Sequence, residues 1–264
     1  MKVLLFLRFR YKIYTIFLYK NQGEILSMFY NGLDRRKVLI ILAVCAVLVL
    51  IMSGEYKIVL LTLPGVIIAM TFHEFAHAFV ADRLGDTTPR SQGRVTLNPA
   101  SHLDPVGLVL LLFAHIGWGK PVQINPNNFN SNKSIETCEA LVALAGPVMN
   151  FILAFIFMII YYALYCFTNI SLVFLYVIYY TVIVNIGLGV FNLVPIPPLD
   201  GSKIFAKFLP YNAKAWLDRN MQYIYLVFLI LWVTGILSHI VSPVINVVYR
   251  GIDYLVGLIF GLFI

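Results

Sequence analysis

A His-Glu-x-x-His motif at positions 73 to 77 lies inside an apolar stretch, residues 58 to 80, that is long enough to span a bilayer. Only three residues of this stretch are ionisable, and all three belong to the motif: His73, Glu74 and His77. An ionisable side chain at membrane depth costs about 2.5–3.5 kcal/mol on insertion scales. Three of them on one helix therefore need a compensating partner, and a metal ion would supply it.

Side chains four residues apart lie one above the other on one face of an α-helix. The imidazoles of His73 and His77 can therefore converge on a single Zn²⁺ ion. Glu74 follows the first histidine and can reach a metal-bound water as a general base. The competing interpretation is a chance pattern on a buried polar helix face, and the cost of burying three ionisable groups disfavours it.

The composition predicts an integral membrane protein. Of 264 residues, 61% are hydrophobic and only 12% are charged, which is far more apolar than an ordinary soluble domain. The net charge of +7 does not indicate nucleic-acid binding, because the cations cluster beside apolar segments. Membrane orientation and lipid headgroups explain them better. The three cysteines are widely spaced and suggest neither a redox motif nor a zinc motif.

We expect an all-α polytopic membrane protein with about five to six transmembrane helices. A basic or interfacial segment, residues 1–37, precedes a single membrane-embedded domain, residues 38–264. The expected spans are residues 38–52, 58–80, 141–167, 170–194 and 223–241, and residues 244–264 form either a last span or an interfacial helix.

Between the second and third spans, the apolar run at residues 106–116 is too short to cross a bilayer. We interpret it as a re-entrant or interfacial element. It leads into residues 118–124, where glycines, a proline and alternating side chains predict a strand or hairpin that lines the active site. Trp118 and Gly119 of this segment are candidate substrate contacts.

The positive charges predict the orientation. The cluster at residues 35–37 should stay in the cytoplasm, so the span that follows points outward and the histidine-bearing helix returns inward. This parity places Arg90 and Lys207 in the cytoplasm as well. The candidate site then lies in the inner half of the bilayer, because His73 comes about 22 Å along its helix.

Two histidines do not complete a catalytic zinc site, which usually has three protein ligands and a water. Asp200 is the best candidate for the third ligand, because the span count brings it to the same side and three nearby prolines interrupt the helix before it. Glu136, Glu139 and Asp104 remain alternatives. Asp200 could also be a turn residue before a glycine.

Two motifs, taken together, carry a family resemblance. The sequence His-Glu-Phe-Ala-His at residues 73–77, followed by Asn-x-x-Pro-x-Pro-Pro-Leu-Asp-Gly at residues 192–201, resembles the site-2 protease family of intramembrane zinc metalloproteases. The intervening sequences GRVTLNPASHLDPVG, GWGKPVQINPNNF and AGPVMN are also similar to its compact bacterial and archaeal members. The resemblance covers roughly residues 58–215, the expected catalytic core, and leaves no room for a PDZ or CBS domain.

The resemblance implies that His73, His77 and Asp200 hold one zinc ion and that Glu74 activates water. The implied substrates are membrane proteins, cleaved within transmembrane segments as in regulated intramembrane proteolysis. It also makes Asn150 a possible substrate or oxyanion contact.

Other classes of function fit the sequence less well. A catalytically silent zinc-binding protein that escorts membrane partners would not need Glu74. A zinc transporter would carry a series of sites rather than one cluster with a general base. A metalloprotease with a Glu-x-x-x-His or Glu-x-x-x-Asp third-ligand motif is disfavoured, because Glu139 is followed by Ala143.

Overall fold

The computed structural model describes residues 56–105, 107–108 and 119–261. The expected span at 38–52, most of the short apolar element at 106–116, and Trp118 lie outside these residues. Within the described ranges, four helices are long and apolar enough to cross a membrane, and a shorter apolar helix accompanies them. An all-α polytopic membrane protein is therefore confirmed.

The histidine-bearing helix is α4, Tyr56–Arg83, and it contains the expected span at 58–80. It ends where Leu84 and Gly85 leave the helical path. Gly85 has φ +105°, and a Cβ on it would lie 2.7 Å from the backbone nitrogen of Asn130. A residue without a side chain is therefore needed at this point, where residues far along the chain pack against the helix end.

Helices α8, Ile135–Phe167, and α9, Leu172–Asn192, confirm the expected spans at 141–167 and 170–194. Helix α8 begins earlier than expected, because the Ser134 hydroxyl caps it by accepting a hydrogen bond from the Thr137 amide. At 1.5 Å per residue, α8 is about 50 Å long and exceeds the hydrocarbon thickness of about 30 Å. Helices α4, α8 and α9 pack against one another and form the centre of the bundle.

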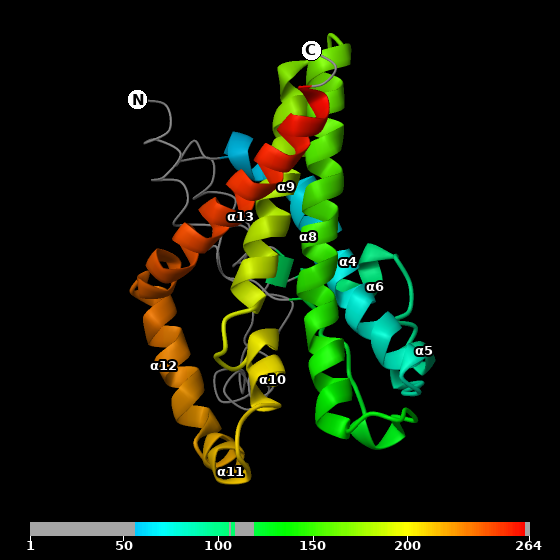
Figure 1. The fold of residues 1–264 in the computed structure, drawn as a ribbon, viewed down its shortest axis with the longest axis vertical. Coiled ribbons are helices and arrows are strands. Elements are labelled where there is room, and N and C mark those ends of the chain that lie inside the picture. The colour runs from blue at the N-terminus through cyan, green and yellow to red at the C-terminus, as the bar shows by residue number, and fades with distance from the viewer. Residues whose placement is uncertain (1–55, 106, 109–118, 262–264) are drawn as a thin grey trace, which may run out of the picture.

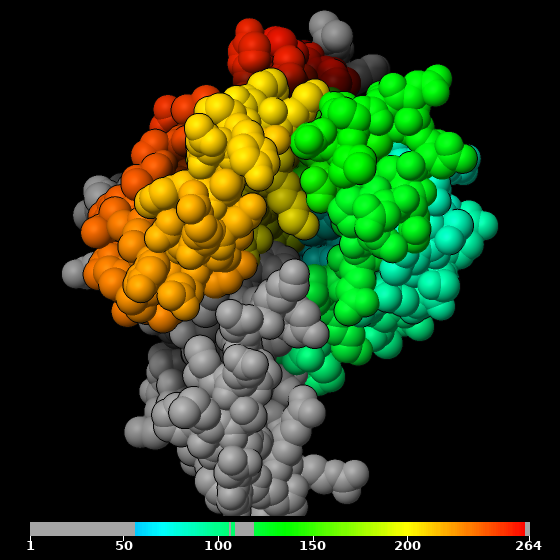
Figure 2. Space-filling view, turned by 90° about the horizontal axis from the view of Figure 1, so that it is seen from below, coloured from blue at the N-terminus to red at the C-terminus, as the bar shows by residue number. Residues whose placement is uncertain are grey.

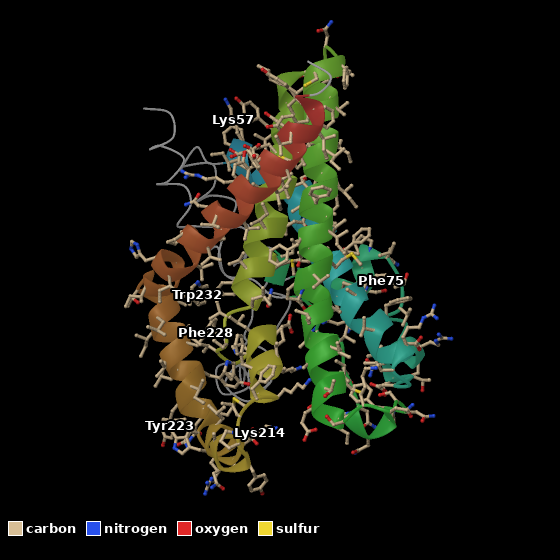
Figure 3. The ribbon with its side chains drawn as sticks, in the orientation of Figure 1. Lys57, Phe75, Lys214, Tyr223, Phe228 and Trp232 are labelled. Carbon is tan, nitrogen blue, oxygen red and sulfur yellow. The ribbon has the colours of Figure 1, made fainter. Side chains whose placement is uncertain are left out.

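After α9 the prolines interrupt the helix, as predicted. The chain continues into two short helices, α10, Asp200–Ala206, and α11, Tyr211–Arg219. These helices lie toward the same end of the molecule as α5, Thr88–Ser91, whereas the C-terminal ends of α8 and α13 lie at the other end (Figure 1). Lys57 and Lys214 mark the two ends (Figure 3).

The predicted span at 223–241 is wrong. The chain breaks inside this range: the 13-residue helix α12, Met221–Val233, ends there, and the longer α13, Ile236–Phe260, begins after Gly235. Gly235 has φ +76°, a left-handed conformation that glycine adopts without strain and that ends the first helix. Helix α13 is one of the four candidate spans and packs against α8 and α9.

Helix α12 packs against α9 through Phe228, which contacts Phe191 of α9 and also Trp232 of its own helix. Phe228 is only 2% exposed, and its ring centroid lies 6.3 Å from that of Phe191 and 6.4 Å from that of Trp232. Figure 3 labels Phe228 and Trp232 on this helix.

The strand or hairpin expected at residues 118–124 is reduced, within the described residues, to one isolated antiparallel bridge between Leu103 and Gly119. Two features prevent a longer ladder. Pro121 has no N–H to donate, and the N–H of Val122 donates to the Glu74 carboxylate rather than to a neighbouring strand. The short helix α6, Pro99–His102, precedes the bridge.

Candidate metal centre

Helix α4 brings His73 and His77 onto one face, as their spacing predicts. Their Nε2 atoms lie 3.0 Å apart, with ring centroids 4.6 Å apart. Both residues are buried, His73 more deeply at 1% exposure. The two imidazoles thus lie together inside the helix bundle, placed to act as two ligands of one metal ion.

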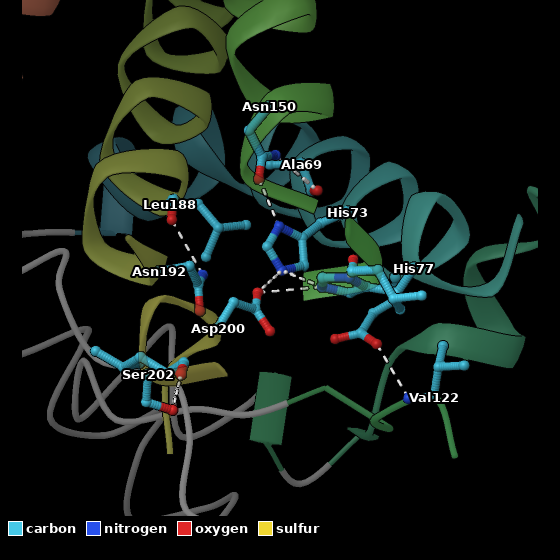
Figure 4. Close-up of polar contacts among 12 residues, drawn as sticks. Ala69, His73, His77, Val122, Asn150, Leu188, Asn192, Asp200 and Ser202 are labelled. Atoms are coloured by element: carbon cyan, nitrogen blue, oxygen red, sulfur yellow. Dashed lines mark hydrogen bonds and ion pairs between the residues drawn. The ribbon is translucent and has the colours of Figure 1, made fainter. Parts of the chain in front are cut away.

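Asp200, the first residue of α10, completes the group. Its Oδ2 atom lies 3.1 Å from the Nε2 atom of each histidine, and the three side chains converge in Figure 4. In the described part of the chain this is the one group of three His, Cys, Asp or Glu side chains that could hold a metal. The alternative ligands are elsewhere: Glu136 is exposed at the start of α8, and Asp104 accepts a hydrogen bond from the Gly107 amide.

The outer ring nitrogens fix the tautomers. The Nδ1 atom of His77 lies 2.6 Å from the Val142 carbonyl, which can only accept, so this nitrogen carries the hydrogen. The Nδ1 atom of His73 lies 2.7 Å from the Asn150 Oδ1 atom, which is also an acceptor. In the neutral form of each ring the Nε2 atom then keeps its lone pair, so both Nε2 atoms and the Asp200 oxygen face one point as potential ligand atoms. A cation is the group that satisfies such an arrangement.

The dimensions of the site also suit zinc. Tetrahedral zinc with bonds of about 2.0–2.1 Å separates its ligand atoms by about 3.3 Å, close to the 3.0 and 3.1 Å found here. Gly146 on α8 keeps this space open. A Cβ on Gly146 would lie 2.5 Å from the Nε2 atom of His77 and 2.7 Å from that of His73.

Glu74 lies beside this group but is not part of it. Its side chain is buried, and its Oε2 atom accepts a hydrogen bond of 3.2 Å from the Val122 amide, marked by a dashed line in Figure 4. A Cβ on Gly119 would lie 3.9 Å from the Oε1 atom of Glu74. The segment that begins at Gly119 therefore runs past the expected general base.

Comparison with known proteins identifies the family. A model of peptidase family M50 matches residues 166–235, a range that contains Asp200 but neither histidine. YwhC of Bacillus subtilis (strain 168), named as a zinc metalloprotease, is 38% identical over 189 residues, which are 68% of this chain and 83% of that protein. The chain belongs to peptidase family M50, the site-2 protease family.

More distant relatives carry the same kind of name. Rip2 of Mycolicibacterium smegmatis, also named as a zinc metalloprotease, is 29% identical over 68% of this chain and 69% of that protein. Rip2 of Mycobacterium tuberculosis (strain H37Rv) is 28% identical over 74% of this chain and 71% of that protein. No solved structure matches the chain. This M50 protein is thus a multi-pass membrane protease with Zn²⁺ as its cofactor.

The candidate metal centre of the M50 protein is open to one side. The Asp200 side chain is 18% exposed, whereas that of His73 is 2% exposed. Figure 2 shows a hollow between α10 and α8 in the face that carries the short helices, and its floor has the colour of α4. Water can therefore approach from the Asp200 side, although the histidines lie inside the bundle.

The candidate substrate contacts have different surroundings. Asn150 is 0% exposed, and its side chain bonds to His73 Nδ1, the Ala69 carbonyl and Asn185, which favours a role in holding that histidine. Gly119 lies beside Glu74, and its contact with substrate stays a prediction. Trp118 lies outside the described residues.

Sequence reasoning missed three participants: the Val142 carbonyl, the Val122 amide and Gly146. The first two are backbone groups, and their contacts depend on how distant segments pack rather than on side-chain type. Gly146 does have a signal, because it belongs to the AGPVMN sequence at residues 145–150. A glycine inside a long helix usually marks close packing.

Proposed function

We propose that this M50 protease is an intramembrane endopeptidase that cleaves locally unwound transmembrane segments of membrane proteins. His73, His77 and Asp200 hold the zinc ion, and Glu74 is the general base. The observation that supports this most strongly is the convergence of three potential ligand atoms, two ring nitrogens and a carboxylate oxygen, next to a buried glutamate.

Each residue has a separate task in the mechanism. Zinc, when bound, polarises the scissile carbonyl and lowers the pKa of its water toward about 7. Glu74 accepts the proton of that water and later delivers it to the leaving amine. Asp200 adds a negative charge that partly neutralises the cation, and Asn150 and the Val142 carbonyl hold the histidine rings in place.

The substrate must be unwound before it can react, because the peptide bonds of a transmembrane helix are hydrogen-bonded and shielded. We propose that the segment 119–124 holds the unwound piece by β-addition, through its backbone groups other than the Pro121 nitrogen and the Val122 amide, which bonds to Glu74. The segment is fixed at both ends: the Lys120 amide donates to the His102 carbonyl at 2.7 Å, and the Asn125 amide donates to Asp86 at 2.8 Å.

We place the opening of the site on the cytoplasmic side. Arg90 and Lys207 belong to elements at the same end of the molecule as α10 and α11 (Figure 1), and cytoplasmic loops are enriched in lysine and arginine. The membrane in question would be the cell membrane.

The test is cleavage of a model transmembrane substrate by the purified protein in detergent. The expected result is a defined product within the transmembrane segment, lost when a chelator removes the metal and restored by added zinc. A purified protein that binds zinc but cleaves neither this substrate nor any of a panel of transmembrane segments would favour the silent escort function instead.

A further inference from the structure

A chain of buried hydrogen bonds runs from the candidate metal centre into the interface between α8 and α9. Asn150 Oδ1 pairs with His73 Nδ1 at 2.7 Å. Asn150 Nδ2 donates to Asn185 Oδ1 at 3.0 Å and to the Ala69 carbonyl at 3.1 Å. Asn185 Nδ2 donates to the Thr181 carbonyl at 2.9 Å. Both asparagines are 0% exposed, so water does not compete for these bonds.

Two backbone carbonyls fix the direction of every bond in this chain, because a carbonyl can only accept. The Thr181 carbonyl requires the amide nitrogen of Asn185, so the Asn185 oxygen faces Asn150. The Asn185 oxygen and the Ala69 carbonyl are both acceptors, so the Asn150 nitrogen must be the atom that donates to them. The Asn150 oxygen therefore faces His73, whose Nδ1 must carry the hydrogen, so in the neutral ring Nε2 keeps its lone pair.

We propose that Asn185 is a positioning residue for the metal centre, which sets the tautomer of His73 through the amide of Asn150. The inference rests on the proposed zinc site. Without Asn185, the Asn150 nitrogen loses one of its two acceptors, and a flipped amide becomes less costly. A flipped Asn150 would direct an N–H at His73 Nδ1, favour the tautomer with hydrogen on Nε2, and remove the lone pair from the ligand set.

The hydrogen bond between Asn150 and Asn185 also joins two helices, so the test must separate positioning from packing. The measurement is the zinc dissociation constant of the purified full-length protein in detergent, obtained by competition with a chromophoric chelator. We expect Asn185→Leu and Asn185→Ala to bind zinc about three- to tenfold more weakly. Asn185→Asp, protonated at this buried position, keeps a donor for the Thr181 carbonyl and an acceptor for Asn150, so it should stay within about twofold of the wild-type protein.

Thr181→Val is the matched control. Thr181 is buried one turn earlier on α9, and its hydroxyl donates only within its own helix, to the Val177 carbonyl at 2.8 Å. The substitution removes a buried polar group but keeps the carbonyl that Asn185 uses. Zinc affinity should therefore remain near that of the wild-type protein.

A double-mutant cycle gives the decisive readout, because a residue that acts through Asn150 cannot act when Asn150 is gone. Asn185→Ala should cause no further loss of zinc affinity in an Asn150→Ala background. Unchanged affinity in Asn185→Leu, an equal loss in Thr181→Val, or a full additional loss in the double variant would overturn the inference while the proposed function stands. A wild-type protein that binds no zinc would overturn both.

Discussion

Glu74 and Asp200 are both carboxylates at the candidate metal centre, but their contacts differ. An oxygen of Asp200 lies 3.1 Å from both histidine Nε2 atoms, whereas Glu74 accepts the Val122 amide at 3.2 Å. We expect Glu74→Gln to lower the cleavage rate at least about 100-fold, because a neutral amide cannot accept a proton from water. Its zinc content, measured on the purified variant by metal analysis, should equal that of the wild-type protein. Zinc loss as large as that of a ligand variant would assign Glu74 to the metal instead.

Gly146 gives a second prediction at the scale of one residue. Gly146→Ala would place a methyl group 2.5 and 2.7 Å from the two Nε2 atoms, so the rings must move apart. We expect zinc affinity at least about tenfold lower, although alanine is the better helix former. Gly251→Ala is the control, because nothing lies within 4 Å of its added Cβ. Equal zinc affinity in both variants would show that the space beside Gly146 is not used by the site.

The motifs singled out His73, Glu74, His77 and Asp200, and the structure brings these four side chains close together, as expected from residue type and from the order of the two motifs. They could not predict the partners of the outer ring nitrogens. The Val142 carbonyl meets His77 from a helix 65 positions away, and no side chain marks that contact. The Asn150 side chain was singled out, but its orientation toward His73 follows from packing with Asn185 and Ala69.

At the scale of elements, Asp86 ties the segment after Gly119 to the end of α4. Burial alone would raise the pKa of Asp86, but hydrogen bonds from Thr88, Asn125 and Asn128 outweigh it, and the net effect is a lowered pKa. Because the folded-state pKa is depressed, the stabilisation is present above the unfolded pKa of about 3.9 and is lost as pH falls through the lower folded-state value.

Asp86→Asn should therefore destabilise the protein by about 1–3 kcal/mol at pH 7, because its amide NH₂ would face N–H donors. The comparison is thermal unfolding in detergent at neutral pH and near pH 3, where we expect the difference between variant and wild type to shrink. The exposed Asp218, changed to Asn, serves as control. A difference that stayed constant or grew on acidification would contradict this account of Asp86.

Hydrophobic runs predicted α4, α8 and α9 because each run is bounded by polar residues. The break between α12 and α13 was missed, since Thr234 and Gly235 interrupt the apolar pattern only briefly. A glycine after a run of helix residues is a stop signal that could have found it. The expected strand failed for another reason: the Val122 amide is used by a side chain rather than by a neighbouring strand.

For the whole molecule, the arrangement of helices predicts which residues share a side of the membrane. Arg90 and Lys207, both exposed, should face the cytoplasm, and Thr168 at the far end of α8 should face the other side. Single cysteines at these positions, introduced after Cys45, Cys138 and Cys166 are replaced, can be labelled in intact cells with a reagent that does not cross the membrane. Labelling at position 90 but not at 168 would reverse the proposed orientation.

We propose that Asp200 joins two histidines 127 and 123 positions away to form one zinc site. The most direct test is the zinc content and proteolysis of Asp200→Asn, which keeps the size of the side chain but removes the charge. We expect a large fall in both, whereas Glu136→Gln, Glu139→Gln and Asp104→Asn should keep their zinc. Full zinc occupancy in Asp200→Asn, with loss in Glu136→Gln or Glu139→Gln, would contradict the proposed ligand set.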